Sequence, residues 1–120
     1  MAKEFDWHTP MYYDSMPTLR ADKTPQLWIL GGEDYEAPAA ETSIRIKSLI
    51  ADGLPFTLAY YARAEHGMTL FETQPDGTRV STFYEPGYFA MIRDFARTGR
   101  LSGKYGDARI TYPRGGRPAP

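Results

Sequence analysis

The sequence predicts an α/β fold, a parallel β-α-β-α unit with a β-hairpin after its second core strand. Two short apolar runs, residues 26–30 and 54–61, are bounded by proline and glycine, which favours buried strands over fragments of a helix. One helical pattern separates the two runs. Asp34 follows the first run and His66 follows the second. Two strands joined through one helix run parallel, so the acid and the histidine are expected at the same edge of the sheet.

The segment between the two runs is predicted to be one helix, residues 39–51. Pro38 suits its first turn, because a helix needs no amide hydrogen there. Gly53 suits the position just past its end, where a left-handed backbone favours glycine. Three apolar side chains recur near helical spacing inside it: Ile44, Leu49 and Ile50.

The second half of the domain begins with a predicted hairpin. Residues 68–73 and 79–83 are β-prone and flank a Pro-Asp-Gly turn at residues 75–77. A last helix then opens near Pro86 and ends at Gly99. Its apolar stripe is predicted to be core: Tyr88, Met91, Ile92 and Phe95.

Three regions follow from this order. Residues 1–24, rich in proline and tyrosine, are predicted to be an irregular N-terminal arm. Residues 25–99 form the domain. Residues 100–120 are predicted to be a basic, Gly- and Pro-rich tail that is partly disordered, above all at residues 114–120.

Composition excludes several classes of function. The chain has 120 residues, enough for one domain, and a net charge of −1. Residues 93–120 carry 7 basic against 2 acidic side chains, which we interpret as a solvated end, so no nucleic-acid partner is predicted. The absence of cysteine excludes disulfides and thiolate chemistry. No apolar run reaches the roughly 20 residues of a membrane span. No cofactor is predicted.

Localisation stays open at this stage. The first eight residues contain no apolar signal core. A complete chain of this kind is expected in the cytoplasm, whereas a longer parent protein leaves the compartment unknown.

Asp34 and His66 are the predicted catalytic residues. Open α/β sheets bind ligands at the carboxyl ends of their strands, and an acid that orients a histidine is part of a catalytic triad. An acid just before a helix is also what a helix-capping residue looks like, and Glu33 and Glu36 compete for either role. The Asp34 carboxylate is expected within hydrogen-bond distance of Nδ1 of His66.

Other polar residues are given ordinary roles. His8 is interpreted as a surface histidine, and Glu65 as solvated. A metal site made of Asp34, Glu36 and His66 lacks any ligand spacing typical of metal sites, so no metal is predicted.

The order of these segments resembles the C-terminal part of α/β hydrolases. Residues 25–38 resemble the segment around the catalytic acid, and residues 53–67 resemble the last core strand and its histidine loop. Residues 11–17 resemble a lead-in of prolyl-oligopeptidase-like and esterase-like members. The resemblance covers about residues 10–98 and implies that Asp34 is the triad acid and that His66 is the base.

The nucleophile of that family is missing from this sequence. A Gly-x-Ser-x-Gly motif would precede the acid, and none of the five serines has glycines at both flanking positions: Ser15, Ser43, Ser48, Ser81 and Ser102. The oxyanion-hole segment and the first strands are missing too. The chain therefore resembles part of an esterase or peptidase that is inactive alone. The alternative is a stand-alone, non-catalytic dimerising or binding module derived from this fold.

A partner is expected in either case. Loss of the preceding strand would leave residues 26–30 at a sheet edge, and such an edge is a template for pairing with another chain. The sequence therefore predicts a homodimer, formed through this edge or by exchange of the N-terminal arm. A missing N-terminal hydrolase portion is the other expected partner.

Overall fold

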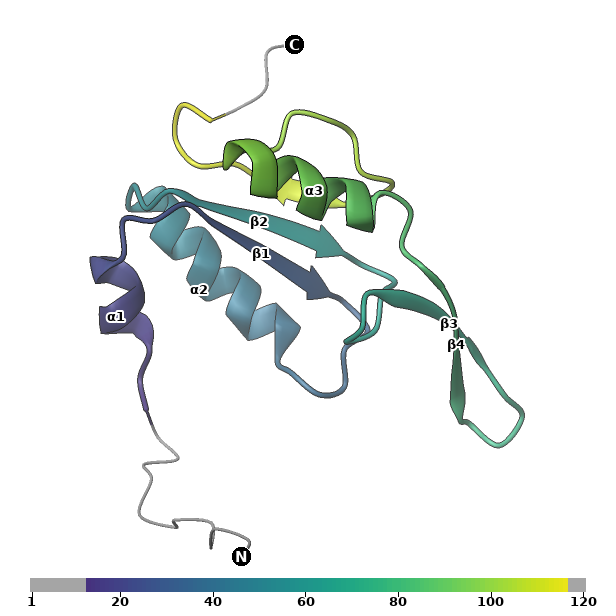
Figure 1. The fold of residues 1–120 in the computed structure, drawn as a ribbon. Coiled ribbons are helices and arrows are strands. Elements are labelled where there is room, and N and C mark those ends of the chain that lie inside the picture. The colour runs from purple at the N-terminus through teal and green to yellow at the C-terminus, as the bar shows by residue number, and fades with distance from the viewer. Residues whose placement is uncertain (1–12, 117–120) are drawn as a thin grey trace, which may run out of the picture.

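A three-stranded mixed sheet lies between two helices in the computed structural model, which describes residues 13–116 (Figure 1). The strands lie in the order β1-β2-β5, with bounds β1 (Gln26–Gly31), β2 (Phe56–Tyr61) and β5 (Arg109–Thr111). Strands β1 and β2 are parallel, whereas β5 runs antiparallel to β2. The predicted α/β class and the parallel pair are thus confirmed.

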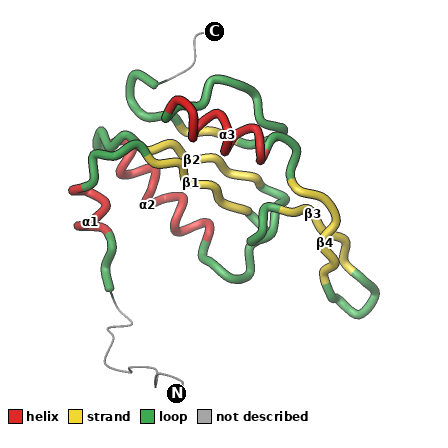
Figure 2. Tube along the Cα trace, viewed as in Figure 1, coloured by secondary structure: helices red, strands yellow, loops and turns green. Residues whose placement is uncertain are grey.

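The β1-α2-β2 unit matches the sequence prediction closely. Helix α2 (Ala39–Ala51) has the predicted bounds, and it returns the chain so that Gln26 pairs with Phe56. Gly53 follows the helix with φ of +97°, a left-handed conformation that favours glycine. Helix α2 covers one face of the sheet and helix α3 (Tyr88–Thr98) covers the other (Figure 2).

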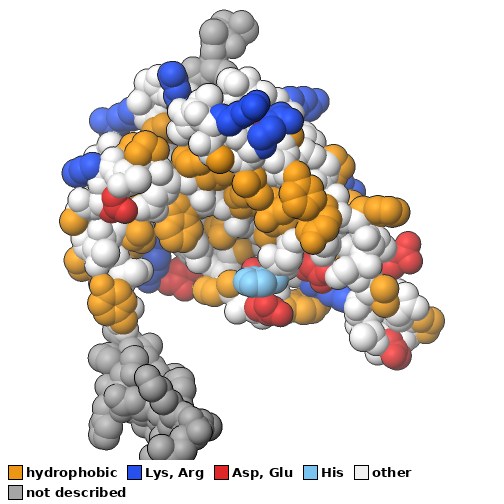
Figure 3. Space-filling view, viewed as in Figure 1, with side chains coloured by type: hydrophobic (Ala, Val, Ile, Leu, Met, Phe, Trp, Pro, Cys, Tyr) orange, Lys and Arg blue, Asp and Glu red, His pale blue; other side chains and the backbone are white. Residues whose placement is uncertain are grey.

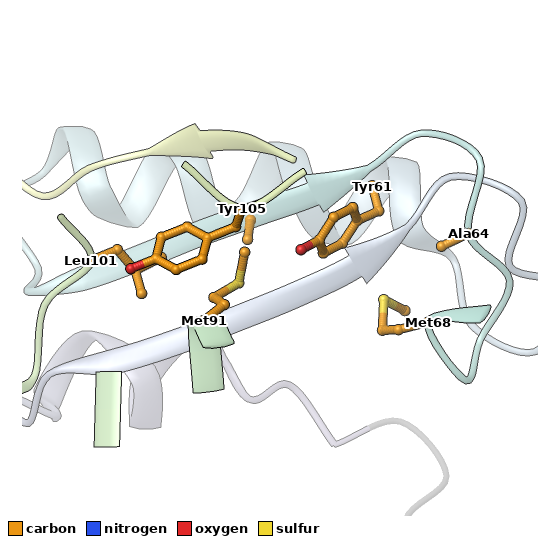
Figure 4. Close-up of a cluster of buried hydrophobic side chains, with 7 residues drawn as sticks. Tyr61, Ala64, Met68, Met91, Leu101 and Tyr105 are labelled. Atoms are coloured by element: carbon orange, nitrogen blue, oxygen red, sulfur yellow. The ribbon is translucent and has the colours of Figure 1, made fainter. Parts of the chain in front are cut away.

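Each face of the sheet has its own core. Buried side chains of α2 and β2 pack on one face, with Trp28 and Leu30 of β1 against them. The other face holds a second buried cluster, shown in Figure 4: Ala59, Tyr61, Ala64, Met68, Met91, Leu101 and Tyr105. Alternate residues of β1, Leu27 and Ile29, pack against this second cluster. The alternation follows from the two-residue period of a strand.

The predicted hairpin is confirmed as a separate two-stranded sheet. Strands β3 (Thr69–Thr73) and β4 (Arg79–Tyr84) pair antiparallel, and Gly77 in their turn has φ of +86°. The hairpin extends away from the three-stranded sheet, beyond the carboxyl ends of β1 and β2 (Figure 1).

The predicted core stripe of α3 is confirmed only in part. Met91 is fully buried, while Tyr88 and Phe95 are partly buried. Ile92 is 39% exposed, so its assignment to the core was wrong. Gly99 ends the helix in a left-handed conformation, as predicted.

Residues 1–24 were predicted to be an irregular N-terminal arm. This prediction is wrong for residues 16–21, which form helix α1 (Met16–Ala21). Proline stands in the first turn of this short helix, where its missing amide hydrogen costs nothing, so Pro17 starts a helix instead of excluding one. Residues 1–12, including His8, and residues 117–120 lie outside the described part of the chain.

The predicted end of the domain at residue 99 is too early, because part of the predicted tail, residues 100–120, packs against the sheet. Leu101 and Tyr105 are buried, and β5 adds a strand to the sheet beside β2. These contacts are non-local, and the glycine-rich composition of the segment concealed them. Within residues 13–116, no helix is long and apolar enough to cross a membrane.

Candidate active site

Two loops at the carboxyl ends of β1 and β2 are joined by backbone hydrogen bonds. The amide of Gly32 donates to the carbonyl of Tyr61 at 2.8 Å, and the amide of Glu33 donates to the carbonyl of Ala64 at 2.9 Å. A Cβ atom added at Gly31 would lie 2.5 Å from the Ala64 carbonyl oxygen. Glycine is therefore required for the two loops to approach this closely.

Asp34 is anchored in the first of these loops. Its side chain is 5% exposed, and Oδ1 accepts the backbone amides of Glu36 at 2.7 Å and Ala37 at 3.0 Å. Pro38 stands at the N-cap of α2, which has no side-chain cap hydrogen bond. The helix-capping alternative is therefore wrong, because Asp34 organises the turn that precedes the helix.

His66 lies in the second loop and meets the other carboxylate oxygen of Asp34. Its Nδ1 atom is 2.9 Å from Oδ2 of Asp34, which confirms the expected geometry. The imidazole is 56% exposed. In Figure 3 the histidine lies on the surface, beside hydrophobic side chains.

The two groups change each other's affinity for protons. Burial acts to raise the pKa of Asp34, but hydrogen bonds from His66 and from two backbone amides outweigh it, and the pKa is lowered. The hydrogen bond to Asp34, followed by its negative charge, raises the pKa of His66 above the ordinary 6.5. Both shifts favour the pair of aspartate and imidazolium.

Glu36 occupies the opposite side of the ring. Its Oε2 atom lies 3.4 Å from Nε2 of His66, and its side chain is 72% exposed. Nε2 is the atom with which a triad histidine takes a proton from its nucleophile. The carboxylate of Glu36 therefore lies where a nucleophile would have to approach Nε2 of His66.

Glu65 was predicted to be solvated; it is partly exposed, and its carboxylate also makes two hydrogen bonds to the hairpin. Its carboxylate accepts a hydrogen bond from Thr69 at 2.6 Å and another from Ser81. The Ser81 hydroxyl, ahead of that of Thr69, lowers the pKa of Glu65. The charged side chain thus fastens both strands of the hairpin to the loop of His66.

Arg79 is a structural residue of the site that the sequence did not indicate. Its guanidinium lies 3.4 Å from the ring centroid of Tyr35 and 4.0 Å from that of Phe71. It also donates to the backbone carbonyl of Glu33 and pairs with its carboxylate at 3.3 Å. Arg79 therefore ties β4 to the loop of Asp34, across 46 positions that no local pattern connects.

A pocket of about 510 Å³ opens beside His66, between the two loops and the hairpin. Its walls combine polar, charged and aromatic side chains with one glycine: Tyr35, Glu36, Glu65, His66, Gly67, Thr69, Arg79, Ser81 and Tyr84. The pocket gives a ligand access to the exposed imidazole.

The described residues supply an acid and a base but no nucleophile next to them. Within residues 13–116 no serine hydroxyl hydrogen-bonds to His66, and Ser81, in the same pocket, is bound to Glu65. Across the same residues, no group of three or more His, Asp or Glu side chains could hold a metal ion.

Comparisons with protein-family models, with curated proteins and with solved structures found no match to this chain. Any functional interpretation therefore depends on the geometry of Asp34 and His66 and on the resemblance of the sequence to the C-terminal part of α/β hydrolases.

Proposed function

We propose that Asp34 and His66 are the acid and the base of a serine hydrolase of the α/β-hydrolase type, an esterase or a peptidase, whose nucleophile lies outside this chain. The observation that carries the proposal is the 2.9 Å contact between Oδ2 of Asp34 and Nδ1 of His66, formed at the carboxyl ends of two parallel strands. The resemblance of residues 25–38 and 53–67 to that family agrees with it.

Each residue has a defined role in this proposal. His66 takes the proton of a serine hydroxyl through Nε2 and returns it to the leaving group. Asp34 holds the proton of the ring on Nδ1 and stabilises the imidazolium that forms. Its two backbone hydrogen bonds suit this role, because they fix the carboxylate before the reaction begins.

The nucleophile must approach Nε2 to within about 3 Å. Glu36 lies on that side of the ring, and its exposed side chain has to turn away to admit a serine. A further strand alongside β1, parallel to it, would end at the same edge of the sheet as Asp34 and His66. The open edge of β1 therefore supports a nucleophile-bearing segment next to β1.

The same edge supports the second candidate, a stand-alone dimerising or binding module. In the described part of the chain, β1 pairs only with β2, and its side chains are half-buried from Gln26 to Leu30. Hydrophobic side chains gather between α3 and α2 on the face shown in Figure 3. A second copy of the chain is the occupant expected in this case.

Isolation of the native polypeptide from its source, followed by labelling with a fluorophosphonate, distinguishes the two candidates. The hydrolase proposal expects a polypeptide or complex larger than 13.6 kDa, labelled on a serine that is outside this sequence. His66→Ala should abolish that labelling. An unlabelled native polypeptide of 13.6 kDa would refute the proposal and favour the module.

The isolated chain is expected to show no turnover of short-chain p-nitrophenyl esters. Triad residues act as a unit, so a base without its nucleophile retains almost none of their effect. Hydrolysis that His66→Ala abolishes would contradict this expectation. Stoichiometric labelling of one of the chain's own serines would contradict it as well.

A further inference from the structure

Glu85 joins β4 to α3, and its carboxyl group is buried. The residue is 2% exposed, and neither side-chain oxygen has a hydrogen-bond partner among the described residues. An ionised carboxylate in such a place is very costly, whereas the neutral acid costs far less.

The segment that follows Glu85 crosses another backbone segment closely. A Cβ atom added at Gly87 would lie 2.6 Å from Cα of Tyr105, and one added at Gly106 would contact the carbonyl of Pro86. Both glycines have positive φ, +85° and +60°. The segment after Glu85 is thus held directly against the loop that precedes β5.

The surroundings do not favour a negative charge on Glu85. The titratable groups near it are Tyr61 of β2, Arg63 after β2, Tyr88 of α3 and Asp107 before β5. Arg63 is already paired with Asp107 at 3.1 Å, so its charge is largely neutralised. Burial, reinforced by the Asp107 carboxylate, raises the pKa of Glu85 above the ordinary 4.5.

Glu85 is connected directly to the turn of His66. Its backbone amide donates to the carbonyl of Met68 at 2.9 Å, and the amide of Met68 donates to the carbonyl of Glu65 at 2.9 Å. Met68 has φ of +58°, a conformation that side-chain-bearing residues rarely adopt. Movement of Glu85 would therefore release a strained turn two residues after His66.

We propose that Glu85 is a neutral carboxylic acid in the folded protein, and that its ionisation with rising pH loosens the β4–α3 junction from the turn that positions His66. The folded state then keeps this proton to a higher pH than the unfolded state does. The stability contributed by Glu85 is therefore complete below about pH 4 and declines as the pH rises through its raised pKa. This inference is independent of the proposed hydrolase function.

The first test compares the melting temperature of the full chain with that of Glu85→Gln across about pH 4 to 8. The amide keeps the shape of the side chain but cannot ionise. The Tm of Glu85→Gln relative to the wild type is expected to rise with pH, by about 4 °C or more over the range. Glu72→Gln, at an exposed glutamate of β3, is the matched control and should show no such change.

The change of this difference with pH is the decisive quantity, because a constant offset from the amide group does not affect it. A difference that is the same at every pH would overturn the proposal. So would a relative Tm of Glu85→Gln that falls as the pH rises, because Glu85 would then be an ion held by Arg63.

The second test needs no variant. The ¹³C signal of the Glu85 carboxyl group should titrate with a midpoint above its ordinary pKa of 4.5. The protection of the Glu85 amide against hydrogen exchange should fall when that signal titrates. Titration at or below pH 4.5, or protection that does not follow the titration, would overturn the proposal.

Discussion

Oδ2 of Asp34 and Nδ1 of His66 lie 2.9 Å apart, although 32 positions separate the two residues in the sequence. The two partners are held very differently. The side chain of Asp34 is 5% exposed and is fixed by two backbone amides, whereas the side chain of His66 is 56% exposed. The buried carboxylate is therefore the fixed reference of the pair, and it determines where the imidazole lies and which nitrogen carries its proton.

Asp34→Asn should lower the pKa of His66 toward its ordinary value of 6.5, because the hydrogen bond and the charge of Asp34 are the main causes of its elevation. Glu36→Gln is the matched comparison and should lower it less, because Glu36 is exposed and 3.4 Å away. A titration of the imidazole C–H signals by NMR measures both variants. Equal shifts in the two variants would show that Asp34 does not dominate the site.

The same shift predicts the direction of a pH effect on stability. The raised pKa of His66 and the lowered pKa of Asp34 mean that their interaction stabilises the fold fully between about pH 4 and pH 6.5. This stabilisation is lost as the pH rises through the raised pKa of His66, or as it falls through the lowered pKa of Asp34. In Asp34→Asn this loss should be absent. Unfolding with urea at several pH values measures it.

Gly31→Ala should separate the loops that carry Asp34 and His66. The new methyl group would lie 2.5 Å from the carbonyl of Ala64, and overpacking of this kind costs about 1–3 kcal/mol. Gly67→Ala is the control, because the nearest atom to its added Cβ is 3.9 Å away. Urea unfolding should show a loss of stability only for Gly31→Ala, accompanied by a fall in the pKa of His66. Equal effects in both variants would contradict the prediction.

Sequence reasoning located the β1-α2-β2 unit because its signals are local. Proline and glycine on both sides of a short apolar run predicted β1. Apolar residues at helical spacing, followed by Gly53, predicted α2. The same local order placed Asp34 and His66 at one edge of a parallel pair. Their contact follows from that topology, and the structure has the two side chains in hydrogen-bond distance.

The residues that sequence reasoning missed depend on non-local contacts. Strand β5 has three residues and becomes a strand only by pairing with β2. In the sequence, Arg79 is indistinguishable from an exposed hairpin residue. In the structure its guanidinium lies against the rings of Tyr35 and Phe71. Glu85 has no signal in the sequence that distinguishes it from an exposed glutamate, because its burial arises only in the folded chain, where Arg63 and Asp107 lie near it.

Arg79→Ala should weaken the attachment of the hairpin to the loop of Asp34. The change removes stacking on Tyr35 and Phe71 and a hydrogen bond to Glu33, a loss of about 1–2 kcal/mol. Arg93→Ala is the control, since Arg93 is exposed and, within residues 13–116, forms an ion pair with the adjacent Asp94 alone. The free energy of unfolding in urea should fall for Arg79→Ala and stay near the wild-type value for Arg93→Ala.

Arg79→Lys should recover only part of this loss, because an ammonium group lacks the planar face that stacks between two rings. Recovery to the wild-type value would mean that charge alone, and not stacking, holds the hairpin. A loss in Arg93→Ala as large as that in Arg79→Ala would remove any special role for Arg79.

The open edge of β1 should pair with a second copy when the chain is alone in solution. A strand edge with unused amide and carbonyl groups is a template for pairing, and two-fold association is the commonest closed arrangement. Sedimentation should therefore give twice 13.6 kDa at high concentration. A compact monomer from micromolar to millimolar concentration would exclude the homodimer.

Hydrogen exchange identifies the edge without altering the protein. The amides of Gln26 and Gly32 donate to carbonyls of Pro55 and Tyr61, so by alternation the amides of Leu27 and Ile29 point away from β2. These two amides should become protected as the concentration rises. A chain without residues 1–12 should behave in the same way. Association that needs those residues, with no change at Leu27 and Ile29, would assign the dimer to the N-terminal arm instead of the sheet edge.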